Sequence, residues 1–476
     1  MTGQGHVRVS PGPWRATLHE AAQDFGFGHE GVWLPAHPRA WASPRPAHVG
    51  PSRPLVGAPQ HSSLRKLAFA FLWLLVFAIP WEDAVTIPGF GTSARLMGMA
   101  AMGLGVLAII ETGKVRRPAP GHIIMALFVL LASASYLWSL FPEGTLVQAF
   151  SYIQLFTMVW LIWELASRPP EQIRLMQAYV LGTIVSAVDT VYLYLSHQES
   201  VYQRYAGAKL DANDLGLIMA LSIPVSYPLL IQTKGRVAWI YRLQLVLAGT
   251  TVLLTASRGA TLATIVALII VPLTHARLTG RQRFAVLLTI SSLVCGALVI
   301  VPSSSWDRLS TLPNEFAQGT FTGRTIIWKA GWEIFRVHPF LGIGANAFRV
   351  VVSRVLAEPI RMDQSLLPPA PPAHNTFLSV LVEQGVIGFT LFCALLIVLA
   401  LPLRAMPIFP QALWIVCLGV WVVGASGLTW EMRKPTWFFF GLLLAQCGCV
   451  ARERGTQRYA PIPYEAQLTL LRTSRT

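Results

Sequence analysis

Long apolar runs recur through most of this chain and constrain its fold more than any other feature. Between about residue 64 and residue 451 we count twelve runs, each close to the roughly 20 residues that a helix needs to cross a bilayer core. They predict an all-α, polytopic membrane protein. The expected spans are 64–80, 94–111, 122–140, 146–166, 174–196, 212–232, 237–254, 258–276, 284–301, 374–401, 411–428 and 435–451.

The composition agrees with a chain embedded in membrane lipids. Hydrophobic residues make up 54% of the 476 residues and charged residues only 12%, whereas a soluble domain is usually about 25% charged. The net charge of +15 raises the question of nucleic acid. However, most Lys and Arg residues lie in short clusters between apolar runs, and no nucleic-acid-binding module accompanies them. We therefore expect one membrane domain and no nucleic-acid partner.

The two ends of the chain differ from the apolar middle. Residues 1–60 are rich in Pro, Gly, Ala, Arg and His, and no charged segment followed by an apolar core marks a signal peptide. We predict a disordered cytoplasmic tail there. Its histidines are too irregularly spaced to favour a metal site. Residues 452–476 are expected to form a second, basic cytoplasmic tail.

The distribution of basic residues predicts how the chain crosses the membrane. Lys and Arg concentrate in alternate loops, as they do in cytoplasmic loops of membrane proteins. The richer set is Lys114, Arg116, Arg117, Arg168, Arg174, Lys234, Arg236, Arg242, Arg277, Arg281, Arg283 and Arg404. The poorer set is Arg95, Arg204, Lys209, Arg258, Arg433 and Lys434. Both termini are thus predicted to be cytoplasmic, and the polar insert 302–372 is predicted to face outward.

The outward insert has its own helical pattern. Apolar and aromatic residues recur at three- and four-residue spacing: Ile327, Trp328, Gly331, Ile334, Phe335 and His338. This spacing predicts an amphipathic helix lying on the membrane, with Arg324 and Trp328 on one face. Gly342 and Gly344 follow the helix. We expect them to form a turn, since two alternating glycines are weak evidence for a phosphate cradle.

Four cationic or ionisable residues are predicted to share the outward face: Arg204, Arg258, Arg324 and His374. An interfacial arginine often only extends its head group to the lipid surface, and for any one of the three that is the simpler interpretation. Arg258 fits that interpretation least well. It lies between two apolar runs, where a cation is costly unless it meets an anion or a watery cavity.

Several short motifs follow one another along the chain. They are Gly207 with Asp211-Ala212-Asn213-Asp214, then Ser257-Arg258-Gly259, Gly323-Arg324, His338-Pro339-Phe340-Leu341-Gly342-Ile343-Gly344, Ala373-His374-Asn375-Thr376-Phe377 and Glu383-Gln384-Gly385-Val386-Ile387-Gly388. In this order they resemble the O-antigen ligase and O-antigen polymerase superfamily of bacterial membrane glycosyltransferases. The resemblance covers about residues 64–450. Ala212 departs from it, because a proline often precedes the asparagine in that family.

The resemblance implies glycan transfer at the outer, periplasmic face of the bacterial inner membrane. The donor would be a polyprenyl-diphosphate-linked glycan, and the acceptor a lipid-A core, another lipid-linked glycan or another hydroxyl compound. By the same analogy the reaction inverts the sugar configuration and uses no metal or other cofactor. Residues 64–451 would then be a transmembrane glycosyltransferase domain.

The resemblance also suggests residue roles. His374 would be the base that deprotonates the acceptor hydroxyl, and Arg258 and Arg324 would bind the donor diphosphate. We add Arg204 to the diphosphate-binding set, and Asn213, Asn375 and Trp328 as supporting residues. Asn375 has two possible roles, to orient the imidazole or to cap the helix that follows, and capping is favoured.

Physical chemistry is consistent with this assignment. A diphosphate leaving group gathers negative charge as its bond to the sugar breaks, and guanidinium groups match phosphate oxygens in shape and charge. Metal-dependent transfer would favour an Asp-x-Asp pair. None of the acidic residues in the predicted outward loops forms such a pair: Glu82 and Asp83 are adjacent, Asp211 and Asp214 have helical spacing, and the others are Asp307, Glu315, Glu333, Glu358, Asp363 and Glu431. The sequence therefore favours metal-free chemistry, with a neutral histidine as base.

Three functions remain as hypotheses. A ligase would transfer a finished glycan, and a polymerase would extend lipid-linked repeat units of O-antigen or exopolysaccharide; both would share the donor and the site. A transporter is the alternative from another class, because twelve spans are a common count for transporters. It would require charged groups within spans and an internal repeat. Asp189 is the main such residue, and no repeat is evident.

Overall fold

The computed structural model describes residues 63–88, 91–113, 115–198, 204–300, 324–357 and 370–458, together with the single positions 303, 306 and 310. The predicted tail 1–60, most of the predicted tail 452–476 and much of the insert 302–372 lie outside the described residues.

The described chain is helical, as predicted. In order, the helices that we discuss are α2 (Ser63–Ala78), η2 (Ile79–Ala84), α3 (Ser93–Thr112), α4 (Pro120–Ala134), η3 (Ser135–Leu137), α5 (Pro142–Leu165), α6 (Pro169–Leu195), α7 (Ala212–Gln232), η4 (Gly235–Val237), α8 (Ala238–Leu254), α9 (Arg258–Leu268), α10 (Ile270–His275), α11 (Gly280–Ile300), α14 (Arg324–Val337), α15 (Phe348–Ala357), α16 (Thr376–Ala400), η8 (Leu401–Ala405), α17 (Ile408–Ala425) and α18 (Lys434–Arg458). A small antiparallel pair, β1 (Thr86–Ile87) and β2 (Gly91–Thr92), was not predicted.

Ten helices among the described residues are long and apolar enough to cross a membrane, and they coincide with ten of the predicted spans. The other two predicted spans, 284–301 and 435–451, fall in α11 and α18. The prediction of an all-α, multi-pass membrane protein is confirmed. The span 258–276 consists of α9 and α10, which meet at Ile269. Pro272 follows closely and cannot donate a backbone hydrogen bond, which accounts for the interruption.

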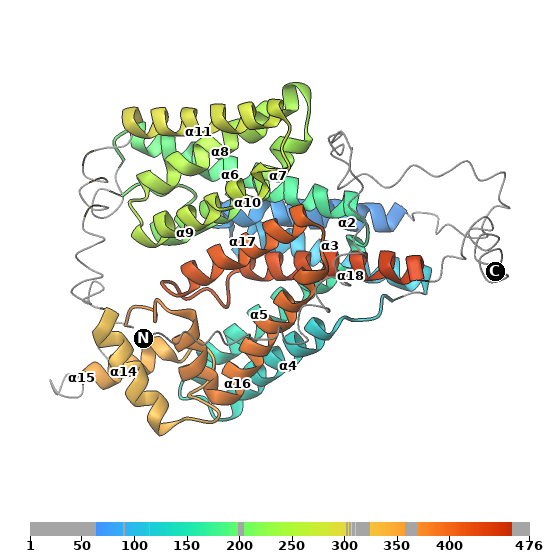
Figure 1. Ribbon diagram of the computed structural model, residues 1–476. Helices are drawn as coiled ribbons and strands as arrows, with labels where there is room; N and C mark the ends of the chain where they lie inside the picture. Colours follow the sequence, from blue (N-terminus) through green and yellow to red (C-terminus); the bar gives the residue numbers. More distant parts are fainter. Residues whose placement is uncertain are drawn as a thin grey trace, which may run out of the picture. The chain divides into compact units, whose positions relative to one another are not determined.

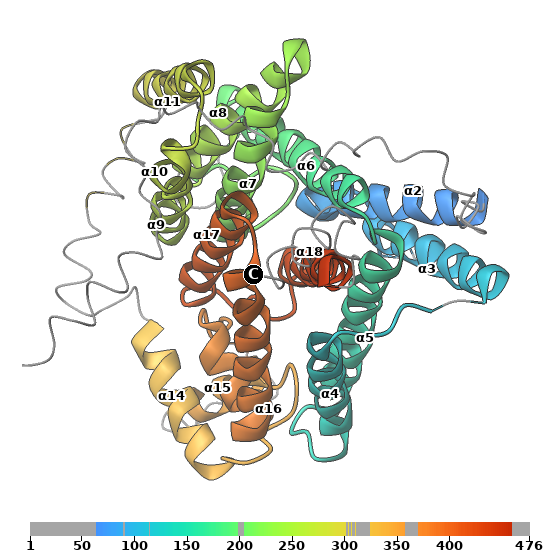
Figure 2. The same cartoon turned by 45° about the vertical axis from the view of Figure 1, so that its right-hand side comes forward.

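Helix α7 lies in the interior of the bundle. Every residue from Asp214 to Leu230 is buried, and the helix packs against α6, α8, α9 and α17 (Figures 1 and 2). By contrast, α3 and α5 expose many apolar side chains, among them Leu107 and Val147. A helix that is apolar on all sides belongs in a core, and exposed apolar faces on the outer helices suit contact with lipid. The N-terminal end of α7 is therefore held by neighbours on several sides.

The described part of the insert packs on α16. Helix α14 buries Ala330, Gly331 and Ile334 and contacts α15 and α16 (Figure 1). Its exposed side carries the charged Lys329, Glu333 and Arg336 together with Trp332. The predicted amphipathic helix is thus confirmed, and α15 is a second amphipathic helix beside it. Together with α16 they form a small apolar core of their own.

Candidate active site

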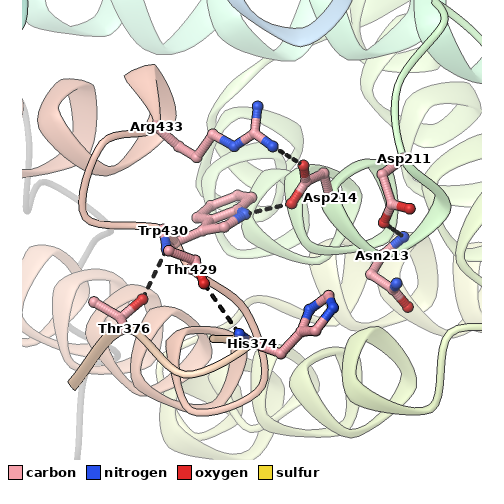
Figure 3. Close-up of polar contacts among 8 residues, drawn as sticks. All are labelled: Asp211, Asn213, Asp214, His374, Thr376, Thr429, Trp430 and Arg433. Carbon is pink, nitrogen blue, oxygen red and sulfur yellow. Dashed lines mark hydrogen bonds and ion pairs between the residues drawn. The ribbon is translucent and has the colours of Figure 1, made fainter. Parts of the chain in front are cut away.

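His374 lies immediately before α16, and neighbouring segments fix its backbone. Its N–H donates to Thr429 Oγ1 at 3.1 Å (Figure 3). The carbonyl of the preceding Ala373 accepts from Trp328 Nε1 at 2.8 Å. His374 has φ +48°, in the left-handed region that a non-glycine residue adopts only at a cost. Helix α14 and the α17–α18 loop thus hold this histidine in a strained, defined position.

Asn375 caps α16. Its side-chain oxygen accepts from the N–H of Leu378 at 3.0 Å, which satisfies one of the free donors at the helix start. Of the two roles considered for Asn375, the structure shows the cap.

The imidazole of His374 is half-buried and poorly stabilised as a cation. Burial lowers its pKa to about 4, and the nearby Arg324 guanidinium acts in the same direction, while Asp211 opposes them. The ring is therefore neutral at pH 7. Its Nδ1 is buried and has no hydrogen-bond partner among the described residues. A neutral ring with an unengaged nitrogen is what a general base requires.

Asn213, at the start of α7, connects three segments. Its side-chain oxygen accepts from Arg204 Nη2 at 2.8 Å and from Ser257 Oγ at 3.0 Å. Arg204 Nε also donates to the Thr255 carbonyl at 2.9 Å. Asp211 caps α7 and accepts from the Asn213 N–H at 2.8 Å. The α6–α7 loop, the start of α7 and the α8–α9 turn are thereby joined at one amide side chain.

A cavity of about 40 Å³ brings Arg324 to the same place. It is lined by Asn213, Leu217, Ser257, Gly259, Ala260, Arg324, Gly424, Gly427 and Leu428. Arg258 is half-buried and lies between two of the lining residues, Ser257 and Gly259. In Figure 3 the imidazole of His374 points toward Asn213. Arg204, Asn213, Arg324 and His374 therefore converge, and Arg258 begins a helix at the edge of the same cavity.

The sequence did not indicate the group beside this site. Asp214 accepts from Trp430 Nε1 at 2.8 Å and pairs with Arg433 (Figure 3). In the sequence, Arg433 was interpreted only as a basic residue of a loop. The available signals were the aspartate of the Asp211-Ala212-Asn213-Asp214 motif and two adjacent basic residues, Arg433 and Lys434, on the same predicted face.

The motifs 338–344 and 383–388 pack closely against each other through their backbones. We call this contact the glycine clamp; it consists of Gly342, Gly344, Glu383 and Gly385. All three glycines have positive φ. The N–H of Gly344 donates to the Glu383 carbonyl at 2.9 Å, and the N–H of Val386 donates to the Pro339 carbonyl at 2.8 Å. A Cβ at Gly342 or Gly385 would clash with backbone atoms of the other chain segment in the clamp. The two alternating glycines thus form the expected turn.

The carboxylate of Glu383 completes the clamp. One oxygen accepts from the N–H of Asn346 at 2.8 Å and the other from the N–H of Phe348 at 3.1 Å. The residue is 4% exposed. Its oxygens are therefore engaged in fixing the start of α15 against α16.

Two further observations concern the alternatives. Among the residues that the structure describes, no three His, Cys, Asp or Glu side chains gather as metal ligands would. Asp189, the residue considered for a transporter, accepts from the N–H of Ala208 at 2.6 Å. It therefore ties the α6–α7 loop to α6.

Comparison with known proteins is consistent with this geometry. The profile of the O-antigen ligase family matches residues 243–393, a segment that contains Arg258, Arg324 and His374. The exopolysaccharide production protein ExoQ of Rhizobium meliloti (strain 1021) is 23% identical over 300 residues, which cover 61% of this chain and 67% of the relative. The family match and this relative support the O-antigen ligase superfamily for this chain.

Proposed function

We propose that this protein transfers a glycan from a polyprenyl-diphosphate donor to an acceptor hydroxyl. The reaction takes place at the periplasmic face of the bacterial inner membrane, without a metal and with inversion. The family match and the ExoQ relative support a ligase- or polymerase-type membrane enzyme of polysaccharide assembly. The observation that carries the finer proposal is the neutral imidazole of His374 beside the Arg324 guanidinium.

In the proposed reaction His374 takes the proton of the acceptor hydroxyl. The acceptor oxygen attacks the anomeric carbon from the face opposite the diphosphate and forms the new glycosidic bond. The bond from that carbon to the diphosphate oxygen breaks, and its electron pair leaves with the diphosphate. Arg324, Arg258 and Arg204 stabilise the charge that develops there, which lowers the barrier because the charge is larger in the transition state.

Donor binding would adjust the strength of the base. An imidazole whose pKa is about 4 is neutral but weakly basic. A diphosphate beside Arg324 offsets the guanidinium charge, which raises the pKa of His374 toward its ordinary value. His374 would then become a better base only when the donor is bound.

The remaining residues act through position. Trp328 and Thr429 fix the backbone around His374, Asn213 orients Arg204, and Asn375 begins α16. The predominance of Lys and Arg in alternate loops supports a periplasmic site with both termini cytoplasmic.

Reconstitution tests the proposal. Full-length protein in detergent is given a synthetic polyprenyl-diphosphate glycan and EDTA, with and without a lipid-A core acceptor. Product that requires the core and persists in EDTA is the expected ligase result. Activity that EDTA abolishes and Mg²⁺ restores would contradict the metal-free mechanism. No product with any acceptor offered would instead favour the transporter.

A polymerase is the second candidate, because the relative is named for exopolysaccharide production. The same reaction without the lipid-A core separates the two. A ladder of lengthened lipid-linked chains identifies a polymerase, and unchanged donor identifies a ligase.

A further inference from the structure

A second cavity is lined in part by Arg433, the partner of Asp214. It has a volume of about 300 Å³ and is bounded by the end of η2, by β2, by the start of α3, by α5 and by the residues that open α18. Its lining includes Arg95, Arg433, Lys434, Glu82, Ser151 and Gln154. We call it the α3–α18 pocket. A volume of about 300 Å³ is at the lower end of the range for small-ligand sites.

The charges of the α3–α18 pocket favour an anion. Three of its lining residues are cationic, and Glu82 is the only acidic one. Glu82 is paired with Lys434, whose side chain is 25% exposed, and Arg433 remains 42% exposed although it also pairs with Asp214. Arg95 is exposed, and its Nε lies 3.5 Å from Gln154 Oε1. Positive charge therefore exceeds negative charge around an accessible space.

The backbone adds to this preference. Thr92, which precedes α3, and Lys434, the first residue of α18, both line the pocket. The starts of two long helices thus meet at one cavity, and the side chain of Thr92 does not cap α3. Helix N-termini carry free N–H donors and a positive end of the helix dipole, which favour phosphate groups.

The surface of α3 identifies the source of the anion as a lipid. Arg95 is followed at intervals of four, three and four residues by Met99, Met102 and Val106, which share its face of the helix. These side chains are 48%, 47% and 47% exposed, within a helix apolar enough to span the membrane. A cationic head followed by an exposed apolar stripe matches an amphiphile with a charged head and hydrocarbon chains.

We propose that the α3–α18 pocket binds the phosphate group of a membrane lipid, whose hydrocarbon chain lies along Met99, Met102 and Val106 of α3. The site is separate from the proposed donor site and does not depend on transferase activity. Occupancy would act on that site through Arg433, because the phosphate and Asp214 compete for the same guanidinium. Asp214 is adjacent to Asn213, which holds Arg204.

Native mass spectrometry of the full-length protein in a neutral detergent tests the proposal. Dioleoyl phosphatidic acid is titrated against dioleoylglycerol, which has the same chains and no phosphate. We expect the first to bind and the second not to bind at equal concentration. Polyprenyl phosphate is titrated separately, and the tighter of the two phosphorylated lipids identifies the source of the headgroup. Inorganic phosphate serves as a competitor and is expected not to displace the lipid at equal concentration.

Two variants test the location of the site. Arg95→Gln removes one charge-assisted contact and should weaken phosphatidic acid binding about tenfold or more. Ser151→Phe fills the pocket and leaves every charge in place; its hydroxyl bonds only to the Val147 carbonyl of its own helix, so no partner outside α5 is lost. It should also weaken binding. Arg281→Gln, an exposed arginine at the start of α11, is the matched control and should bind as wild type.

Three results would overturn the proposal. Equal binding of dioleoylglycerol would exclude phosphate recognition. Displacement of the lipid by an equal concentration of inorganic phosphate would exclude the hydrocarbon contribution. Wild-type affinity in both Arg95→Gln and Ser151→Phe, with each variant monodisperse by size-exclusion chromatography, would exclude this pocket as the site.

Discussion

The glycine clamp and the segment around His374, which both contact α16, use their polar groups in opposite ways. In the glycine clamp both carboxylate oxygens of Glu383 accept backbone N–H groups, and the residue is almost fully buried. At the start of the same helix the imidazole of His374 is half-buried, and its Nδ1 has no partner among the described residues. The polar groups of the glycine clamp fix the backbone, whereas the imidazole of His374 is neutral and available to act as a base.

This difference separates two kinds of motif residue. Glu383 and Gly385 stabilise the fold, whereas His374, about ten positions earlier, is available for chemistry. The clamp holds α14 and α15 against α16, and these helices in turn place Trp328 against the residue before His374. Substitutions in the clamp should therefore reduce folded protein, whereas substitutions at His374 should reduce activity alone.

The largest expected effect is that of Gly385→Ala. Gly385 has φ +63° and ψ −168°, a conformation open essentially to glycine, and a Cβ there would clash with the Phe340 carbonyl. We expect loss of most folded protein, measured as the monodisperse peak of a fluorescent fusion in detergent. Gly103→Ala in α3 is the control, because a Cβ there meets nothing within 4 Å. A wild-type peak for Gly385→Ala would show that the clamp is not structural.

His374→Ala should abolish transfer and leave folding intact. General base catalysis typically contributes about 100-fold or more to the rate, and His374 is the residue to which we assign that role, beside Arg324. The rate is measured in the reconstituted reaction, and folding by size-exclusion chromatography. His374→Asn is a useful second variant, since asparagine tolerates left-handed backbone. His338→Ala, at the end of α14, should keep its activity; full activity in the His374 variants would refute the base assignment.

Arg258→Lys tests whether the proposed diphosphate site depends on guanidinium geometry. A lysine keeps the charge but cannot form two parallel hydrogen bonds to phosphate oxygens. We expect kcat/KM to fall about 10- to 100-fold, with the protein still folded. Arg281→Lys at the start of α11 is the matched control. If Arg258→Lys retains full activity, Arg258 does not hold the diphosphate by a bidentate contact.

A smaller effect is expected on the pH dependence. His374 acts in its neutral form, so kcat/KM should fall only as the pH drops through its free-enzyme pKa, about 4. Arg324 lowers that pKa, whereas burial is the larger cause. Arg324→Gln should therefore move the acid limb of the profile to higher pH without reaching 6.5. The limb is measured from the residual kcat/KM of the variant at each pH. An unchanged limb would contradict the electrostatic contact between the two residues.

The sequence predicted the helices better than their mutual contacts. Length and apolarity were enough to place ten of the twelve predicted spans as membrane-spanning helices of the described chain, and three- and four-residue spacing was enough for α14, because both signals are local. The lateral arrangement was not accessible in this way. In lipid, the apolar pattern does not decide which helix face meets which neighbour. The pair Asp214–Arg433 joins positions 219 residues apart, and the sequence around either residue does not indicate that the two pair.

Within the site, the ordered motifs predicted which residues converge but not how they are held. Arg204 and Asn213 were chosen separately, as a diphosphate ligand and a supporting residue. The structure shows that Ser257 and Arg204 share the Asn213 side-chain oxygen. This three-residue contact depends on the α8–α9 turn packing against the start of α7, which no short window of sequence contains.

The smallest predicted effect falls at Asn375, where the two regions meet. Asn375 belongs to the motif of the base, yet its side chain performs a structural task as the cap of α16. Asn375→Ala should lower stability by about 1 kcal/mol, seen as a small decrease in the Tm measured by thiol-reactive or light-scattering unfolding in detergent. Asn375→Ser preserves a capping oxygen and should recover most of that loss. If activity instead falls as far in Asn375→Ser as in His374→Ala while the Tm is unchanged, Asn375 orients the imidazole. Asn375 would then serve the reaction as well as the fold.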